Sequence, residues 1–205
     1  MNNKWGLALT AALAAALAAL PARAQEAPGR FYMGISGAAV TSDASRSMES
    51  ITGGVYDEST PNGGKVYAGY LRGNWGLEFG YYYLGKYEIE NAGGQVQDVL
   101  ETSAIVVAGV YQVEMWRGFD FVARAGVAFT NAQYDCKLSC GTMPFVDTET
   151  KDLSGMWGIG LNMRMTQSLS LLLEYEHIGS VHHNVGNIEF QDGYYLYSVG
   201  ARLTF

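Results

Sequence analysis

The chain has 205 residues, of which 48% are apolar, 13% aromatic and 16% charged, and its formal net charge at pH 7 is −7. The apolar content excludes a wholly disordered chain. The acidic balance and the lack of a long Lys/Arg cluster argue against nucleic acid as a partner, because such binding depends on cationic contacts to phosphates. With 26 Gly and 14 Tyr against 4 Pro and 2 Cys, the composition favours strands over helical bundles.

Residues 1–24 are typical of a secretory signal peptide. They hold a basic residue, an Ala/Leu-rich run over 7–20 and the Ala22-Arg23-Ala24 triplet of a cleavage site. The run is shorter than the ~20 apolar residues that a membrane-spanning helix needs. We therefore predict cleavage after Ala24, which leaves 25–205 with 11 basic and 20 acidic residues and a net charge of −9.

From Arg30 onward, apolar and polar residues alternate with a period of two, which predicts strands whose two faces meet different surroundings. We predict eight strands, at about 30–41, 64–72, 75–84, 99–113, 119–131, 153–165, 168–178 and 194–205. The connections between them alternate in length, at about 22, 2, 14, 5, 21, 2 and 15 residues. Tight turns at one end and long loops at the other are typical of bacterial outer-membrane barrels, and the strands are long enough to cross the hydrocarbon layer. The pattern predicts an all-β fold, an eight-stranded antiparallel up-and-down transmembrane β-barrel formed by residues 25–205.

Charged residues indicate which strand face turns inward. Arg on the lipid-facing side near the middle of the bilayer costs ~2–4 kcal/mol, so the face of the last strand that carries Arg202 must face the lumen. The same argument predicts a polar network in the lumen, formed by Glu78, Arg124, Asn162, Arg164, Glu174, Glu176 and Arg202. The strand predicted at 99–113 is apolar on both faces, so the pattern leaves its orientation open.

Several short motifs support this fold: Phe31-Tyr32-Met33-Gly34, Glu78-Phe79-Gly80-Tyr81, Ala123-Arg124-Ala125-Gly126-Val127, Leu173-Glu174-Tyr175-Glu176 and the terminal Ser198-Val199-Gly200-Ala201-Arg202-Leu203-Thr204-Phe205. Across nearly all of 25–205 the chain resembles the small eight-stranded outer-membrane barrels of the OmpA-domain, OmpX and opacity-protein type. The resemblance implies a monomer in the cell outer membrane, surrounded by outer-membrane lipid and lipopolysaccharide. It also implies that the barrel-assembly machinery recognises the outward residues of the last strand, namely Tyr197, Val199, Ala201, Leu203 and Phe205.

The inward residues predict a filled lumen and no large pore, because eight strands enclose a space just wide enough for side chains. Buried charges need partners and full hydrogen bonding. We therefore expect a paired polar core in which Arg124 pairs with Glu174 or Glu176. A proton or ion path, or a catalytic pair of carboxylates, is the competing interpretation of the same residues.

The long connections are where recognition is expected in a rigid barrel, which suggests a structural or surface-interaction role. Cys136 and Cys140 lie in the third long connection and favour a local disulfide, since metal binding by the pair would lack two ligands. The first long connection is acidic, with Asp43, Glu49 and Asp57, which favours a solvated surface over a cation site. We expect no cofactor and no metal.

His177, Ser180 and Glu189 support an alternative function. A His, a Ser and an acid at one membrane edge are the parts of a serine esterase. The segment resembles the outer-membrane lipid A deacylase barrels, which implies His177 as base, Ser180 as nucleophile and Glu189 as orienting acid. Gly179 stands where that family has its Ser, so the match is partial. A cluster of histidines at the lipid headgroups is the competing interpretation, and we favour a protein that is not an enzyme.

Overall fold

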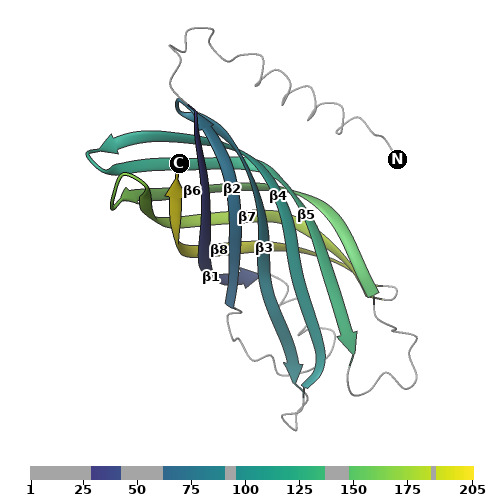
Figure 1. The fold of residues 1–205 in the computed structure, drawn as a ribbon. Helices are drawn as coiled ribbons and strands as arrows, with labels where there is room; N and C mark the ends of the chain where they lie inside the picture. Colours follow the sequence, from purple (N-terminus) through teal and green to yellow (C-terminus); the bar gives the residue numbers. More distant parts are fainter. Residues whose placement is uncertain (1–28, 43–61, 91–95, 137–147, 186–187) are drawn as a thin grey trace, which may run out of the picture.

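The computed structural model describes residues 29–42, 62–90, 96–136, 148–185 and 188–205, with the backbone alone at 87–90, 96–100, 134–136, 148–150, 180–185 and 188–192. The chain forms eight strands: β1 (Arg30–Ser42), β2 (Asn62–Arg72), β3 (Trp75–Glu90), β4 (Val96–Trp116), β5 (Phe119–Cys136), β6 (Thr148–Arg164), β7 (Leu169–Val185) and β8 (Ile188–Thr204). Each strand pairs antiparallel with the next, and β8 pairs with β1, so the sheet closes into a barrel (Figure 1). The predicted fold class is confirmed. The predicted signal peptide, residues 1–24, lies outside the described residues.

The two ends of the barrel differ in how the strands connect. At one end, called here the turn end, the connections are Gly73-Asn74, Arg117-Gly118 and residues 165–168. Gly73 and Gly118 have φ of 63° and 86°, in the left-handed region that favours glycine, which lets these tight hairpins close. The opposite end is called here the distal end. The acidic connection predicted between the first two strands, with Asp43, Glu49 and Asp57, lies outside the described residues.

The strands run further at the distal end than the alternation predicts. β3 continues to Glu90 and β4 begins at Val96, whereas β1 and β2 stop near their predicted ends (Figure 1). The predicted 15-residue connection between the last two strands is wrong, because β7 and β8 remain paired as far as Val185 and Ile188. Backbone pairing needs no alternation of side chains, so a ladder can continue beyond the stretch in which lipid imposes the pattern.

The third long connection is also shorter than predicted. β5 ends at Cys136, so this residue belongs to a strand rather than to a loop. Its side chain and all of Cys140 lie outside the described part of the chain, and the disulfide stays a prediction.

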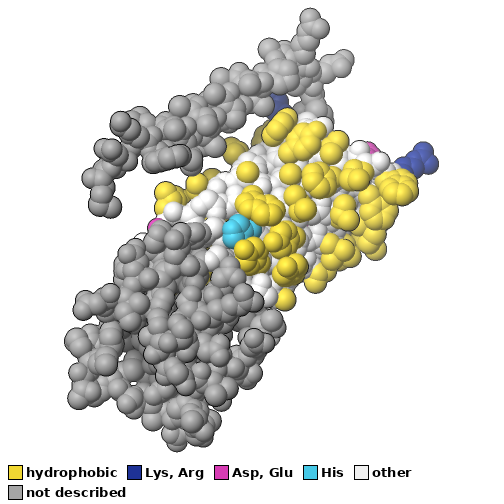
Figure 2. Space-filling view, turned by 180° about the vertical axis from the view of Figure 1, so that it is seen from behind, with side chains coloured by type: hydrophobic (Ala, Val, Ile, Leu, Met, Phe, Trp, Pro, Cys, Tyr) yellow, Lys and Arg dark blue, Asp and Glu magenta, His cyan; other side chains and the backbone are white. Residues whose placement is uncertain are grey.

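Apolar side chains cover the outside of the barrel, as the alternation predicts. Leu77 of β3 is 63% exposed, whereas its neighbour Glu78 is 3% exposed. Exposed apolar residues of every strand form this surface, including Phe31, Ile35, Val66, Phe79, Ile105, Phe129, Trp157, Ile159, Leu173 and Val199. Figure 2 shows one face of this apolar surface, with a histidine set into it. Among the described residues no helix is long and apolar enough to cross a membrane.

The structure decides the orientation of β4, which the sequence left open. Ala104, Val106 and Ala108 are buried in the lumen, whereas Ile105 and Val107 are exposed on the outside. The inward residues are the smaller set, which leaves room for the long side chains of the opposite strands.

The lumen is not polar throughout, which corrects the expectation of a polar core. The inward residues of β7 follow the order Leu172, Glu174, Glu176, Ile178, so that apolar residues flank the charges on both sides. On the distal side lies a buried apolar cluster that contains Ile178, Val40, Leu84, Tyr194 and Leu196. On the turn side lies a second one that contains Leu172, Leu71, Val110 and Val122. Glu174 and Glu176 therefore lie in a layer between these two apolar clusters.

Candidate functional site

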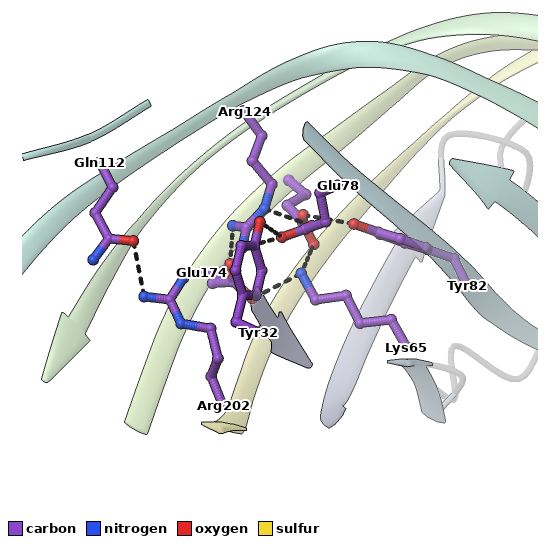
Figure 3. A network of polar contacts seen from close by, with 9 residues as sticks. Tyr32, Lys65, Glu78, Tyr82, Gln112, Arg124, Glu174 and Arg202 are labelled. Atoms are coloured by element: carbon purple, nitrogen blue, oxygen red, sulfur yellow. Dashed lines mark hydrogen bonds and ion pairs between the residues drawn. The ribbon is translucent and has the colours of Figure 1, made fainter. Parts of the chain in front are cut away.

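Arg124 lies at the centre of a buried group of five charged side chains, called here the lumen cluster: Lys65, Glu78, Arg124, Glu174 and Glu176. Its Nε and Nη2 donate to the two carboxylate oxygens of Glu78, over 2.8 and 3.2 Å. Its Nη1 donates to Oε1 of Glu174 (Figure 3). These three residues come from β5, β3 and β7, so one guanidinium joins three strands. Of the two pairings expected for Arg124, the structure contains the one with Glu174.

Lys65 of β2 completes the lumen cluster, and the sequence analysis missed it. Its Nζ lies 2.7 Å from Oε2 of Glu174 and 2.5 Å from Oε2 of Glu176, and the residue is 3% exposed. A signal was present, because Lys65, Tyr67 and Leu71 share one face of β2, and a lysine on that face marks it as inward. Without Lys65, Glu176 would have no cation within ion-pair distance among the described residues.

Tyrosine hydroxyls add further hydrogen bonds to two of the carboxylates. The hydroxyl of Tyr32 donates to Oε2 of Glu78 over 2.9 Å, and that of Tyr82 donates to Oε1 of Glu176 over 3.0 Å. The ring of Tyr67 lies near both cations, with its centroid 5.3 Å from Lys65 Nζ and 5.7 Å from Arg124 Cζ. Such contacts stabilise a buried cation further.

Inward glycines provide the space for this cluster. A Cβ at Gly158 would lie 2.6 Å from Cγ of Glu176, and one at Gly160 would lie 2.9 Å from Cγ of Glu174. A Cβ at Gly34 would overlap the ring of Tyr67. The inward glycines are therefore positions where the long side chain of a neighbouring strand lies against the backbone.

Arg202 lies outside the lumen cluster, toward the turn end. Its Nη2 donates to Oε1 of Gln112 over 2.8 Å, and its Cζ lies 4.9 Å from the ring centroid of Tyr32. Gln112 also donates to Oδ2 of Asp120, which accepts a second bond from Nδ2 of Asn162, both over 2.8 Å. Arg202 thus connects through Tyr32 to the lumen cluster and through Gln112 to a second polar group at the turn end.

Arg164 does not lie inside the lumen, which corrects the prediction. Its side chain is 38% exposed, and its Nη2 lies 2.6 Å from Oε1 of the exposed Glu114 and 3.2 Å from Oδ1 of Asp120. Arg164 is the last residue of β6, where the strand reaches the turn end and water. Alternation assigns a face to a residue, but it does not show how far along the barrel axis the face stays enclosed.

The structure keeps two residues of the esterase alternative, His177 and Glu189, apart in the sheet. His177 pairs with Tyr195 in the sheet, whereas Glu189 pairs with Asn184. Tyr195 and Glu189 are six positions apart on β8, which corresponds to about 20 Å of strand. Nδ1 of His177 lies 3.3 Å from the carbonyl oxygen of Tyr194, and its ring stacks on Tyr195. The side chains of Ser180 and Glu189 lie outside the description. His177 therefore belongs to an aromatic group on the outer surface.

Comparison with known proteins agrees with this architecture. The family model described as "Outer membrane protein beta-barrel domain" matches residues 10–205. The structure is similar to that of Neisserial surface protein A, at 14% identity over 89% of this chain and 100% of that one, with a TM-score of 0.59. It is also similar to the outer membrane protein OprG from Pseudomonas aeruginosa (10% identity, 88% and 97% covered, TM-score 0.55). The N-terminal β-barrel domain of Pseudomonas aeruginosa OprF is a third such structure (12%, 88% and 100%, TM-score 0.52).

No curated protein matches the chain in sequence. At these identities the solved structures support the fold alone, whereas the family model spans all eight strands. The chain belongs to the outer membrane protein β-barrel domain family.

Proposed function

We propose that this outer-membrane barrel has a structural and surface-interaction role, carried by its distal end, and that its lumen is filled and does not form a large pore. The observation that supports the proposal is that buried ion pairs inside the lumen join strands that are not neighbours in the sheet. Lys65 on β2 reaches Glu174 and Glu176 on β7, and Arg124 on β5 reaches Glu78 on β3.

The layers on either side of these ion pairs also support a filled lumen. An ion that moved along the axis would have to cross the apolar cluster with Leu84 and Leu196 and the one with Leu71 and Val122. Transfer of an ion into apolar surroundings without partners costs several kcal/mol. The same layers argue against the ion path that the charged residues alone left open.

Conductance measurements test the filled lumen. We expect purified, refolded protein to show no steady porin-type conductance in planar bilayers of defined lipid, after gel mobility before and after heating has established that the barrel is folded. A steady open state in the wild type would overturn the proposal. A large-conductance porin in the same bilayers provides the positive control.

We further propose that the turn end faces the periplasm and the distal end the cell exterior, following the family pattern of short periplasmic turns. Residues 1–24 would be removed on export, and the barrel would act as a monomer in contact with lipopolysaccharide. Mass spectrometry of the protein isolated from outer membranes tests the cleavage, because a chain that starts at residue 25 is expected. Protease added to whole cells tests the orientation, because only distal segments should be cut.

The outward face of β8 supports recognition by the barrel-assembly machinery. Tyr197, Val199, Ala201, Leu203 and Phe205 form a continuous exposed row at the end of the chain. We expect Phe205→Ala to slow assembly into proteoliposomes that contain the machinery, with little effect on refolding in pure lipid. An equal slowing in both systems would show a folding defect and count against recognition.

A further inference from the structure

We propose that arginines around the turn end bind the phosphate headgroups of anionic phospholipids in the leaflet next to that end. Three exposed arginines lie there: Arg30 at the start of β1, Arg72 at the end of β2 and Arg117 in the turn between β4 and β5. They take no part in the lumen cluster or in the polar group around Asp120, so they face the surroundings of the barrel.

The three arginines have no acidic partner in the described chain. None of their side chains forms an ion pair or a hydrogen bond with another described residue. Glu114 is the one exposed acidic residue in the described part of the turn end, and it already pairs with Arg164 over 2.6 Å. Three guanidinium groups therefore remain for anions from outside the described chain.

An exposed aromatic residue stands beside each of these arginines. The pairs are Arg30 with Phe31, Arg72 with Trp75 across the sheet, and Arg117 with Trp116. Aromatic side chains form girdles at both membrane–water interfaces of outer-membrane barrels, at the level of the lipid headgroups. The neighbouring arginines are therefore at the depth of lipid phosphates.

A guanidinium is well suited to a phosphate headgroup. Its N–H groups form a planar fork that donates to two phosphate oxygens, and its charge is permanent. Attraction to a negatively charged lipid surface corresponds to about a fivefold gain in binding for each Lys or Arg close to it. Phosphatidylglycerol carries this negative charge, whereas the choline group of phosphatidylcholine cancels the charge of its phosphate.

The distal end of the barrel has the opposite charge. Among the described strand ends on that side, Lys86 and Lys151 are the basic residues, and acidic residues outnumber them. The acidic residues are Glu88, Glu90, Asp98, Glu101, Asp135, Glu149, Asp152, Glu189 and Asp192. The charge of the barrel is therefore polarised along its axis, which confines the attraction for an anionic phospholipid to the turn end.

The proposed orientation decides the source of the phosphate. With the turn end toward the periplasm, the adjacent leaflet consists of phospholipids, whereas lipopolysaccharide is on the other side. The choice of phospholipid over lipopolysaccharide rests on this proposed orientation, but the preference of the arginines for an anionic headgroup does not. Protease digestion of whole cells and the lipid experiment can therefore fail independently.

Native mass spectrometry of the full-length folded barrel tests the proposal, in micelles that contain equal amounts of phosphatidylglycerol and phosphatidylcholine. We expect the barrel to retain phosphatidylglycerol over phosphatidylcholine by about fivefold, the gain that one arginine contributes. The ratio should fall toward one as the salt concentration rises, because exposed charges are screened. Equal retention of the two lipids at low salt would overturn the proposal.

Two multiple variants locate the binding. Arg30→Gln/Arg72→Gln/Arg117→Gln should bring the ratio close to one, because all three unpaired guanidinium groups are gone. Lys86→Gln/Lys151→Gln removes cations from the distal end and should retain the wild-type ratio. Gel mobility before and after heating establishes that both variants are folded. A triple variant that still prefers phosphatidylglycerol would overturn the proposal, because the lipid would then bind elsewhere.

Peptidoglycan is the other anionic material on the periplasmic side. The aromatic partners of the arginines favour the headgroups over a polymer that lies beyond the membrane. Wild-type protein in detergent should therefore co-sediment with purified peptidoglycan no more than the triple variant does. Co-sedimentation that depends on the three arginines would assign them to the polymer and overturn the lipid proposal.

Discussion

Arg124 on β5 and Glu174 on β7 form a buried ion pair across the lumen, although 50 positions separate them in the chain. Both residues are almost inaccessible to solvent, and neither carries its charge alone, since Glu78 also bonds to Arg124 and Lys65 to Glu174. Removal of one member of such a pair leaves an uncompensated charge in a region that water does not reach. The cluster therefore makes the stability of the barrel depend on each of its members.

Arg124→Met is expected to lower the free energy of unfolding by ~3–5 kcal/mol, because Glu78 and Glu174 lose their shared donor. Urea unfolding of the protein in vesicles of defined lipid, followed by tryptophan fluorescence, measures this change. Adding Glu174→Gln to the variant should recover part of the loss. The matched control is Arg164→Met, which removes a half-exposed guanidinium that pairs with Glu114 and Asp120. Because Asp120 keeps Gln112 and Asn162 as donors, the loss should be no more than ~1 kcal/mol. Equal losses in Arg124→Met and Arg164→Met would contradict the buried role of Arg124.

Lys65→Met should destabilise the barrel by a similar ~3–5 kcal/mol, because Glu176 is left with only the hydroxyl of Tyr82. Lys65→Met/Glu176→Gln should be more stable than Lys65→Met in the same unfolding assay, since one unpaired charge is gone. Arg72→Met, in the exposed part of the same strand, is the control and should change stability by less than ~1 kcal/mol. No recovery in the double variant would mean that Lys65 acts through packing and not through charge.

Gly34→Ala should destabilise the barrel by ~1–3 kcal/mol, because the added methyl group overlaps the ring of Tyr67. Gly37→Ala is the matched control on the same strand, where a Cβ meets no atom within 4 Å, and it should be neutral or slightly stabilising. Thermal unfolding read by gel mobility ranks the two variants. Tyr67→Leu should restore part of the stability of Gly34→Ala, and a Gly34→Ala variant as stable as Gly37→Ala would argue against the close approach.

Val199→Arg should cost ~2–4 kcal/mol, because Val199 is in the middle of the outward row of β8 and a charge there faces hydrocarbon. Met165→Arg places the same side chain in an exposed turn and should cost ~0–1 kcal/mol. The difference should appear in the free energy of unfolding in lipid vesicles. A cost at Met165 that equals the cost at Val199 would place the hydrocarbon boundary elsewhere on the barrel.

The sequence predicts the barrel well because its strongest signal is local. Alternation of Leu77 with Glu78, or of Val199 with Arg202, follows from the two faces of a strand and needs no knowledge of the partner strand. Beyond the lipid the side chains no longer need to alternate, so the prediction fails there. The predicted strands therefore end too early, whereas β3 continues to Glu90 and β7 to Val185. β4 shows the same limit, since small apolar residues suit both lipid and a tightly filled lumen.

The lumen could be predicted only in part. Alternation correctly turned Glu78, Arg124 and Glu174 inward, but it also turned Arg164 inward at a place where the barrel is open to water. The alternation also turns Lys65 inward, but only the structure shows that Lys65 pairs with Glu174 and Glu176.

The sequence by itself determined that eight strands close into an outer-membrane barrel and which face of most strands meets lipid, because both follow from a period-two pattern within each strand. The tertiary structure decided which charges meet. Lys65 and Glu176 are 111 positions apart, and they touch because barrel closure and the relative shift of the strands bring β2 and β7 to the same depth of the lumen. No pattern within a single strand encodes that shift.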